Sequence, residues 1–74
     1  MNVRISINPD IYNGRPIITG TRITVHTVLG FLGAGESIQS ILEEYPSLSL
    51  ADIHACFAYG ARVLNQPFVL EPVA

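Results

Sequence analysis

Three segments in the middle and latter part of the chain repeat apolar residues at steps of three and four, the spacing of an amphipathic helix. They span residues of about 25–32, 37–45 and 50–64. A short connection around Tyr45-Pro46 joins the second segment to the third. Two amphipathic helices joined in this way form a helix-turn-helix arrangement. The periodicity therefore predicts a mostly α-helical domain whose core is a three-helix helix-turn-helix.

Residues that favour helix ends mark the limits of these segments. Thr24 precedes the first segment, and Ser49 starts a sequence that resembles a capping box, with Asp52 in the first turn. Gly35 follows the first segment, and Pro46 follows the second. Glycine is common just after a helix, and proline cannot continue one. We therefore expect three separate short helices.

The third segment is predicted to bury one face of a helix of about 15 residues. The residues expected to point inward are Leu50, Ile53, Phe57, Ala61 and Leu64. The residues expected to point outward are Ala51, Asp52, His54, Ala55, Tyr59 and Arg62. If the protein reads DNA, this helix is the one expected to enter the major groove.

Residues 1–23 read as a short β-rich arm in front of the helices. The segment Val3-Arg4-Ile5-Ser6-Ile7 alternates apolar and polar residues, which predicts a strand with its three apolar residues on one face. Asn13-Gly14 is a strong turn signal because both residues tolerate positive φ, and residues 15–18 read as the returning strand. A hairpin alone is marginal in water, so the arm must pack on the helices or on another copy of itself.

The composition of the chain predicts an exposed apolar surface. Its 74 residues make one small domain, of which 49% are hydrophobic and 14% charged, with no lysine. So few charged side chains cannot cover the outside of a small sphere. Because apolar surface left outside usually marks an interface, we expect a homodimer or a tight complex with another protein.

Several function classes are not favoured. A single cysteine, Cys56, cannot form an internal disulfide, and the apolar run Val28–Gly35 is far shorter than a membrane span of ~20 residues. With no signal peptide before the fold, the chain reads as a cytoplasmic protein. Without a closely spaced metal-ligand motif, Cys56 reads as a small buried hydrophobe and His54 as a surface residue. We expect no catalytic residues, cofactor, metal or small-molecule substrate.

Positive charge is concentrated at the front of the chain. The net charge of −2 divides into +2 over residues 1–26 and −4 over residues 27–74. The third helix is poorly suited to reading DNA bases. Arg62 is its one outward residue of a type that reads bases, and it lies at the C-terminal end, whereas recognition helices usually present their N-terminal residues to the bases. Asp52 in the first turn would also repel phosphates. Arm arginines suit phosphates or the minor groove better. The candidate DNA-binding residues are Arg4, Arg15, Thr21, Arg22 and Arg62.

The arm arginines and the C-terminal tail each have an alternative interpretation. The arginines also serve as the solubilising surface of a lysine-free protein, and Arg22 could instead pair with an acid that fixes the Gly20-Thr21-Arg22 turn. Residues 65–74 form an apolar tail that either folds back on the domain or docks as an extended strap on a partner. We favour the strap, whose partner-binding candidates are Phe68, Val69, Leu70 and Val73.

A run of spaced matches resembles the domain of unknown function 433 family of bacteria and archaea. The matching residues are Ile5, Pro9, Ile11, Gly14, Pro16, Ile18, Gly20-Thr21-Arg22, Gly35, Tyr45-Pro46 and Asp52-Ile53. Two departures concern helix starts: Thr24 replaces proline, and residues 37–40 replace Ser-Pro-Glu-Glu. The resemblance implies a homeodomain-like helix-turn-helix fold. It also implies the role of an antitoxin whose partner is a small PIN-like ribonuclease.

These inferences give one leading hypothesis and two alternatives. The chain is expected to be a single domain with a β arm (1–23), a three-helix core (24–64) and an apolar tail (65–74). The leading hypothesis is a homodimeric, antitoxin-like protein that neutralises a small nuclease toxin and binds its own promoter as double-stranded DNA. The alternatives are a stand-alone DNA-binding transcriptional regulator and a dimeric scaffold without a DNA role.

Overall fold

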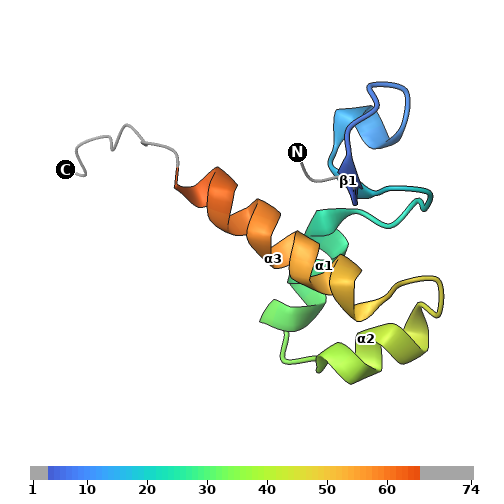
Figure 1. Cartoon of the computed structure of the whole chain (residues 1–74), viewed down its shortest axis with the longest axis vertical. Helices are drawn as coiled ribbons and strands as arrows, with labels where there is room; N and C mark the ends of the chain where they lie inside the picture. Colours follow the sequence, from blue (N-terminus) through green and yellow to red (C-terminus); the bar gives the residue numbers. More distant parts are fainter. Residues whose placement is uncertain (1–3, 66–74) are drawn as a thin grey trace.

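The computed structural model describes residues 4–65, which form a three-helix core preceded by a short two-stranded hairpin (Figure 1). The elements are β1 (Ile5–Ser6), η1 (Tyr12–Gly14), β2 (Ile17–Ile18), α1 (Val25–Gly33), α2 (Ile38–Glu44) and α3 (Leu50–Leu64). The predicted mostly α-helical fold with an N-terminal hairpin is therefore confirmed. Within residues 4–65, no helix is both long enough and apolar enough to cross a membrane.

The first and third helices begin at Val25 and Leu50, as the sequence predicts, and α2 begins at Ile38, one residue after the predicted Ser37. The hydroxyl groups of Thr24, Ser37 and Ser49 each accept a hydrogen bond from the backbone N–H three residues further on. These bonds satisfy N–H groups that have no partner inside the helix. After α1, Gly35 takes a φ of 95°, a left-handed conformation that glycine adopts without strain. Local residue choice therefore fixes where each helix starts.

The hairpin is antiparallel and packs on the helices of its own chain. Ile5 lies opposite Ile18, and Ser6 lies opposite Ile17. Ile17 forms a further bridge to Thr24, which carries the chain directly into α1. Because Ile18 is 2% exposed and belongs to the core, the arm is anchored on the helices, one of the two alternatives left open by the sequence.

The loop between the two strands confirms one prediction and corrects another. Asn13 and Gly14 have φ values of 57° and 78°, as a turn at this position requires. Strand β1, however, ends at Ser6, and Ile7 is 58% exposed instead of facing the core. The chain turns away after β1, because the Asn8 carbonyl accepts a hydrogen bond from the Ile11 N–H at 2.9 Å. The alternation of apolar and polar residues therefore extends to Ile7, one residue beyond the end of the paired strand.

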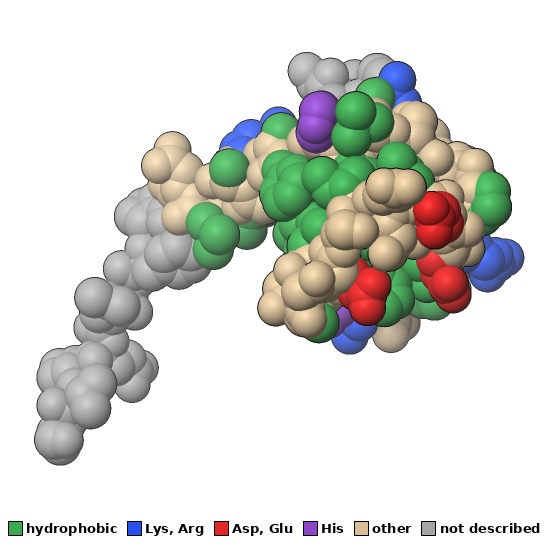
Figure 2. All heavy atoms as spheres, turned by 90° about the horizontal axis from the view of Figure 1, so that it is seen from below, with side chains coloured by type: hydrophobic (Ala, Val, Ile, Leu, Met, Phe, Trp, Pro, Cys, Tyr) green, Lys and Arg blue, Asp and Glu red, His purple; other side chains and the backbone are tan. Residues whose placement is uncertain are grey.

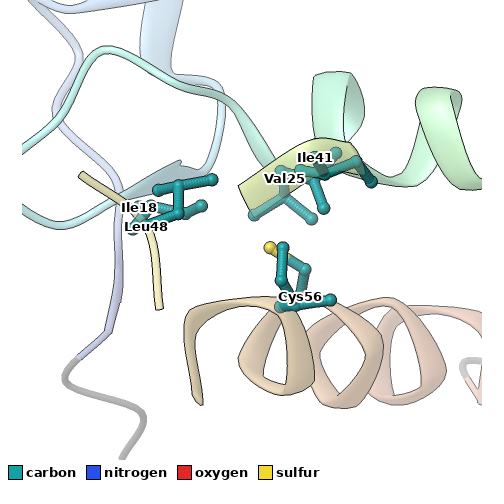
Figure 3. Close-up of a cluster of buried hydrophobic side chains, with 7 residues drawn as sticks. Ile18, Val25, Ile41, Leu48 and Cys56 are labelled. Carbon is teal, nitrogen blue, oxygen red and sulfur yellow. The ribbon is translucent and has the colours of Figure 1, made fainter. Parts of the chain in front are cut away.

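The core lies where the three helices and the hairpin meet (Figure 3). Its buried side chains are Ile18, Val25, Val28, Ile41, Leu48, Ile53 and Cys56. Strand β2, each of the three helices and the turn between α2 and α3 all contribute to this cluster. Beside it, the rings of Phe31 and Tyr45 pack at a centroid distance of 6.0 Å, so Tyr45 contacts the end of α1.

The buried face of α3 differs from the predicted one. Ile53 is buried as expected, but Asp52 and Ala55, expected outside, are buried too. The residues expected inward that are exposed are Leu50, Phe57, Ala61 and Leu64. Apolar residues occur on both sides of α3, so periodicity alone selected the wrong side. The structure packs the side that allows close approach to α1, since a Cβ on Gly60 would lie 3.2 Å from the Leu29 Cδ1.

Candidate functional site

Asp52 joins the arm to the first turn of α3. One carboxylate oxygen accepts a hydrogen bond from the Arg4 guanidinium at 3.0 Å, and the other accepts the backbone N–H of Ser49 at 2.9 Å. Arg4 and Asp52 thus form an ion pair, with 48% and 12% of their side chains exposed. Burial acts to raise the pKa of Asp52, but the bonds from Ser49 and Arg4 outweigh it and hold the pKa below its usual value.

This ion pair changes the roles expected for two residues. The sequence predicts that Asp52 faces outward and repels phosphates. In the structure this side chain is instead buried and bound to Arg4. The guanidinium of Arg4, a candidate for DNA contact, is bound within the chain. Within residues 4–65 Arg22 forms no ion pair, so the alternative in which it pairs with an acid to fix its turn is not seen; the arginine that pairs with an acid is Arg4. The arm cations that remain fully outward are Arg15 and Arg22.

The turn that precedes Arg22 is fixed by the hydroxyl group of Thr21. This hydroxyl donates to the carbonyl oxygen of Ile18 at 2.8 Å and accepts the N–H of Ile23 at 3.0 Å. Gly20 supplies a φ of 82° at the same turn. The hydroxyl of Thr21, a candidate DNA-binding residue, is therefore engaged in hydrogen bonds within the turn. The exposed Arg22 follows directly after this turn.

An open groove of about 590 Å³ lies between this turn and the loop after β1. Ile7, Ile11 and Ile17 supply its apolar lining, and Arg22 also lines it. Ile7 is 58% exposed, so the groove presents apolar surface to solvent beside a cation. Sequence reasoning missed this groove because Ile7 was assigned to a strand, on the same face as Ile5, whereas β1 ends at Ser6.

The outer face of α3 carries large apolar side chains. Leu50, Phe57 and Leu64 are 49%, 45% and 72% exposed. Arg62, the candidate base-reading residue of this helix, is exposed near its end, with its guanidinium 5.5 Å from the centre of the Tyr59 ring. Cation–π contact of this kind holds an arginine against its own helix. His54 is exposed, as predicted.

Acidic residues gather on a different part of the molecule. Glu36, Glu43 and Glu44 surround an open depression of about 470 Å³ that also includes Phe31 of α1. Figure 2 shows acidic side chains grouped on one side of the face it displays, beside hydrophobic side chains that reach the surface. The glutamates on α2 are exposed, as expected of a solvated face. Negative charge therefore lies on α2 and the turn before it.

Cys56 is a core side chain, as predicted. It is 0% exposed, and burial, with a smaller influence of the Asp52 charge, raises the pKa of its thiol to about 11. A thiol that stays protonated is a poor nucleophile. In the part of the chain that the structure describes, no group of three or more His, Cys, Asp or Glu side chains lies close enough to hold a metal ion.

The apolar tail, residues 65–74, extends past the described residues after Asn65. Its partner-binding candidates Phe68, Val69, Leu70 and Val73 lie outside the described residues, and their role stays a prediction.

Comparison with known proteins finds relatives for most of the chain. A family model described as "Protein of unknown function (DUF433)" matches residues 5–60. The uncharacterized protein y4eO of Sinorhizobium fredii is 36% identical over 56 residues, which cover 76% of this chain and 25% of that protein. The crystal structure of a DUF433 member protein from Anabaena variabilis matches with a TM-score of 0.78 and 30% identity, over 80% of this chain and 58% of that chain. The chain thus spans about a quarter of one relative and somewhat more than half of the other.

Proposed function

The chain belongs to the DUF433 family, and on that premise we propose that it is a cytoplasmic, antitoxin-like binding protein that neutralises a small PIN-like nuclease. The description of the family assigns it no activity. The proposal therefore rests on the resemblance noted above and on the surfaces that the described residues present. In this role the protein binds and blocks its partner and performs no chemistry itself.

The observation that carries the proposal is the groove beside Arg22. Ile7 and Ile11 supply apolar contact above the buried Ile17, and Arg22 supplies a cation on a turn held by Thr21. Because the hydrogen bonds of Thr21 fix the backbone of this turn, little ordering of the main chain is needed to hold Arg22 at the groove on binding. An apolar groove with a positive edge suits a partner whose own surface combines apolar and acidic groups. A nuclease whose active site is built of carboxylates is such a partner.

The outer face of α3 favours a protein partner over DNA. Reading bases in the major groove relies on Arg, Lys, Asn and Gln near the start of the helix. Here the exposed residues from Leu50 to Ala61 are uncharged, and Arg62 stands near the far end. Base recognition by α3 is therefore not part of the proposal.

Co-expression with the nuclease from the neighbouring gene tests the proposal. We expect the nuclease to be toxic alone, to be harmless with this protein, and to co-elute with it in size-exclusion chromatography. Arg22→Glu and Ile7→Asp should each weaken the complex about tenfold or more, equivalent to about 1.4 kcal/mol. Arg62→Glu and Val63→Asp are the matched controls, since both residues are exposed and lie on α3, away from the groove.

Two results would contradict this assignment. If no complex forms, the protein is not the antitoxin of that nuclease. If the complex forms but the groove variants bind as tightly as the controls, the contact lies elsewhere. A chain ending at Leu64 then measures how much Phe68, Val69, Leu70 and Val73 contribute.

Contact with promoter DNA is the second candidate function, and the placement of charge favours the arm for it. Arg15 and Arg22 are exposed on the arm, whereas the glutamates lie on and before α2. Gel-shift titration at several salt concentrations tests it, with an Arg15→Ala/Arg22→Ala double variant. Each phosphate contact that is lost should lower the slope of log K against log salt by about one. An unchanged slope in the double variant would rule out the arm.

A further inference from the structure

Exposed residues of α3, all apolar except His54, form a regular stripe. Leu50, Phe57 and Leu64 are seven residues apart, and His54 and Ala61 fall between them, so that the steps alternate between four and three. All five are exposed. A repeat of this kind is the seam by which one helix packs along another. The stripe therefore has the form of a helix-pairing surface that has no helix against it within residues 4–65.

The surroundings of the stripe are equally unlike a solvated helix face. Its neighbours Ala51 and Ala58 are exposed as well, and both are small enough to let another helix approach closely. No residue from Leu50 to Ala61 on this outer side carries a formal charge at neutral pH. An exposed helix face is ordinarily rich in charged residues. Apart from His54, the side of α3 turned away from the core thus has the amino-acid composition of a buried helix face.

The C-terminal end of α3 also projects from the rest of the molecule. Every residue from 61 to 65 is exposed, including Val63 at 41% and Leu64 at 72%. Figure 1 shows this end of α3 extending beyond α1 and α2. Helical segments gain most of their stability from packing an apolar face. A partner along α3 would supply that packing to its last turn.

We propose that the occupant of this stripe is α3 of a second copy, packed antiparallel about a twofold axis at Phe57. Leu50 and Leu64 are each seven residues from Phe57, so Leu50 lies opposite the partner's Leu64, and Phe57 lies opposite its own counterpart. A twofold interface must be self-complementary in this way. The dimer forms without any nuclease, so it goes beyond the proposed function.

Helix dipoles support the antiparallel direction. Antiparallel pairing sets the two helix dipoles in opposite directions, which is favourable, whereas parallel pairing would align them. Parallel pairing would also bring the two Arg62 side chains, in the last turns of the helices, to the same end. Asp52 takes no part in this choice, because it is buried and bound to Arg4. Arg15 and Arg22, on the arm, stay outside this interface.

The extent of the stripe sets the expected affinity. A helix of 15 residues is about 22 Å long, so its face is smaller than the roughly 800 Å² per partner of a standard interface. We therefore expect a dissociation constant in the micromolar range.

The oligomeric state of the full chain tests the dimer. Size-exclusion chromatography with light scattering should give twice the chain mass of 8.0 kDa at about 100 μM protein, far above the expected dissociation constant. Phe57→Glu should remain monomeric there, a loss in affinity of about 100-fold or more. Val63→Glu is the matched control on the same helix and should stay dimeric, because Val63 lies off the stripe. Circular dichroism verifies that both variants fold.

Cysteine cross-linking tests the direction of pairing, in a Cys56→Ala background with oxidised glutathione as the oxidant. Phe57→Cys should form a disulfide-linked dimer, because a residue on a twofold axis meets its own counterpart. Leu50→Cys and Leu64→Cys should cross-link efficiently when mixed, but poorly alone.

Three results would overturn the proposal. A full chain that is monomeric at this concentration shows that the stripe does not pair, whether residues 66–74 or a different protein covers it. Efficient self-cross-linking of Leu50→Cys shows parallel pairing. A Phe57→Glu variant that is as dimeric as Val63→Glu places the interface elsewhere.

Discussion

Replacing Asp52 by alanine should destabilise the domain more than any other single change to a charged side chain in the described chain. The carboxylate accepts the backbone N–H of Ser49 at 2.9 Å, its hydroxyl at 3.2 Å, and the guanidinium of Arg4 at 3.0 Å. The first two bonds complete the capping box of α3, and the third attaches the arm. Alanine removes all three acceptor contacts at once.

The magnitude follows from these contacts. Loss of a capping interaction costs about 1 kcal/mol, and loss of a negative charge from the first turn of a helix costs about 0.3–1 kcal/mol. The ion pair contributes at most about 1 kcal/mol, because the Arg4 side chain is 48% exposed. The better helix propensity of alanine returns about 0.5 kcal/mol. The net loss is about 1–2.5 kcal/mol, which lowers Tm by about 4–20 °C in a domain of this size.

Thermal and urea unfolding at pH 7 and one protein concentration measure this loss. Asp10→Ala is the control, since Asp10 is an exposed loop residue, and it should change stability by less than about 0.5 kcal/mol. Arg4→Ala and the double variant complete a cycle whose coupling energy should not exceed about 1 kcal/mol. A loss below about 1 kcal/mol for Asp52→Ala would refute the reasoning. So would an Arg4→Ala variant as unstable as Asp52→Ala, because the ion pair would then outweigh the cap.

Three further predictions concern pH and backbone conformation. Folding lowers the pKa of Asp52 from 3.8, so the stability that its carboxylate contributes is complete above that value and is lost as pH falls through the lower folded pKa. In this acidic range the urea midpoint of the wild type should fall toward that of Asp52→Ala. The Cys56 thiol has its pKa raised from 9.0 to about 11, so the unfolded chain ionises first and stability should fall by about 2–3 kcal/mol between these values. Cys56→Ala should abolish that part of the alkaline loss, and a thiol reagent at pH 8 should react with the wild type only on unfolding. Gly30→Ala, in α1 with open space at the Cβ position, should raise stability by about 0.5–1 kcal/mol, whereas Gly20→Ala, at a φ of 82°, should lower it by about 1 kcal/mol or more. Equal effects of the two alanines in chemical denaturation would contradict this.

The candidate surfaces were only partly accessible to sequence reasoning. The exposure of Arg15 and Arg22 follows from their charge, and it was expected. The groove was not, because it depends on Ile7 leaving the strand pattern where β1 ends. The sequence placed Thr21 in a turn, but the role of its hydroxyl in holding that turn needed the position of the Ile18 carbonyl, which the sequence does not reveal.

The sequence by itself determined where the three helices lie along the chain. Thr24, Ser37 and Ser49 cap their helices through hydrogen bonds to residues three positions away. Positive φ at Gly20 and Gly35 likewise depends on the residue itself. Because both partners of such an interaction lie within a few residues of each other, the local sequence is enough to predict it.

Tertiary structure alone decided which side of α3 is buried and where the arm is attached. Arg4 and Asp52 are 48 residues apart in the chain, and no local pattern joins them. Both sides of α3 are apolar, so each satisfies the helical period equally well. The core takes the side with Ala55 and Cys56, where small side chains let α1 and α3 approach closely. The other side, with Phe57 at its centre, is left outward, because one small domain has only one core in which to bury it.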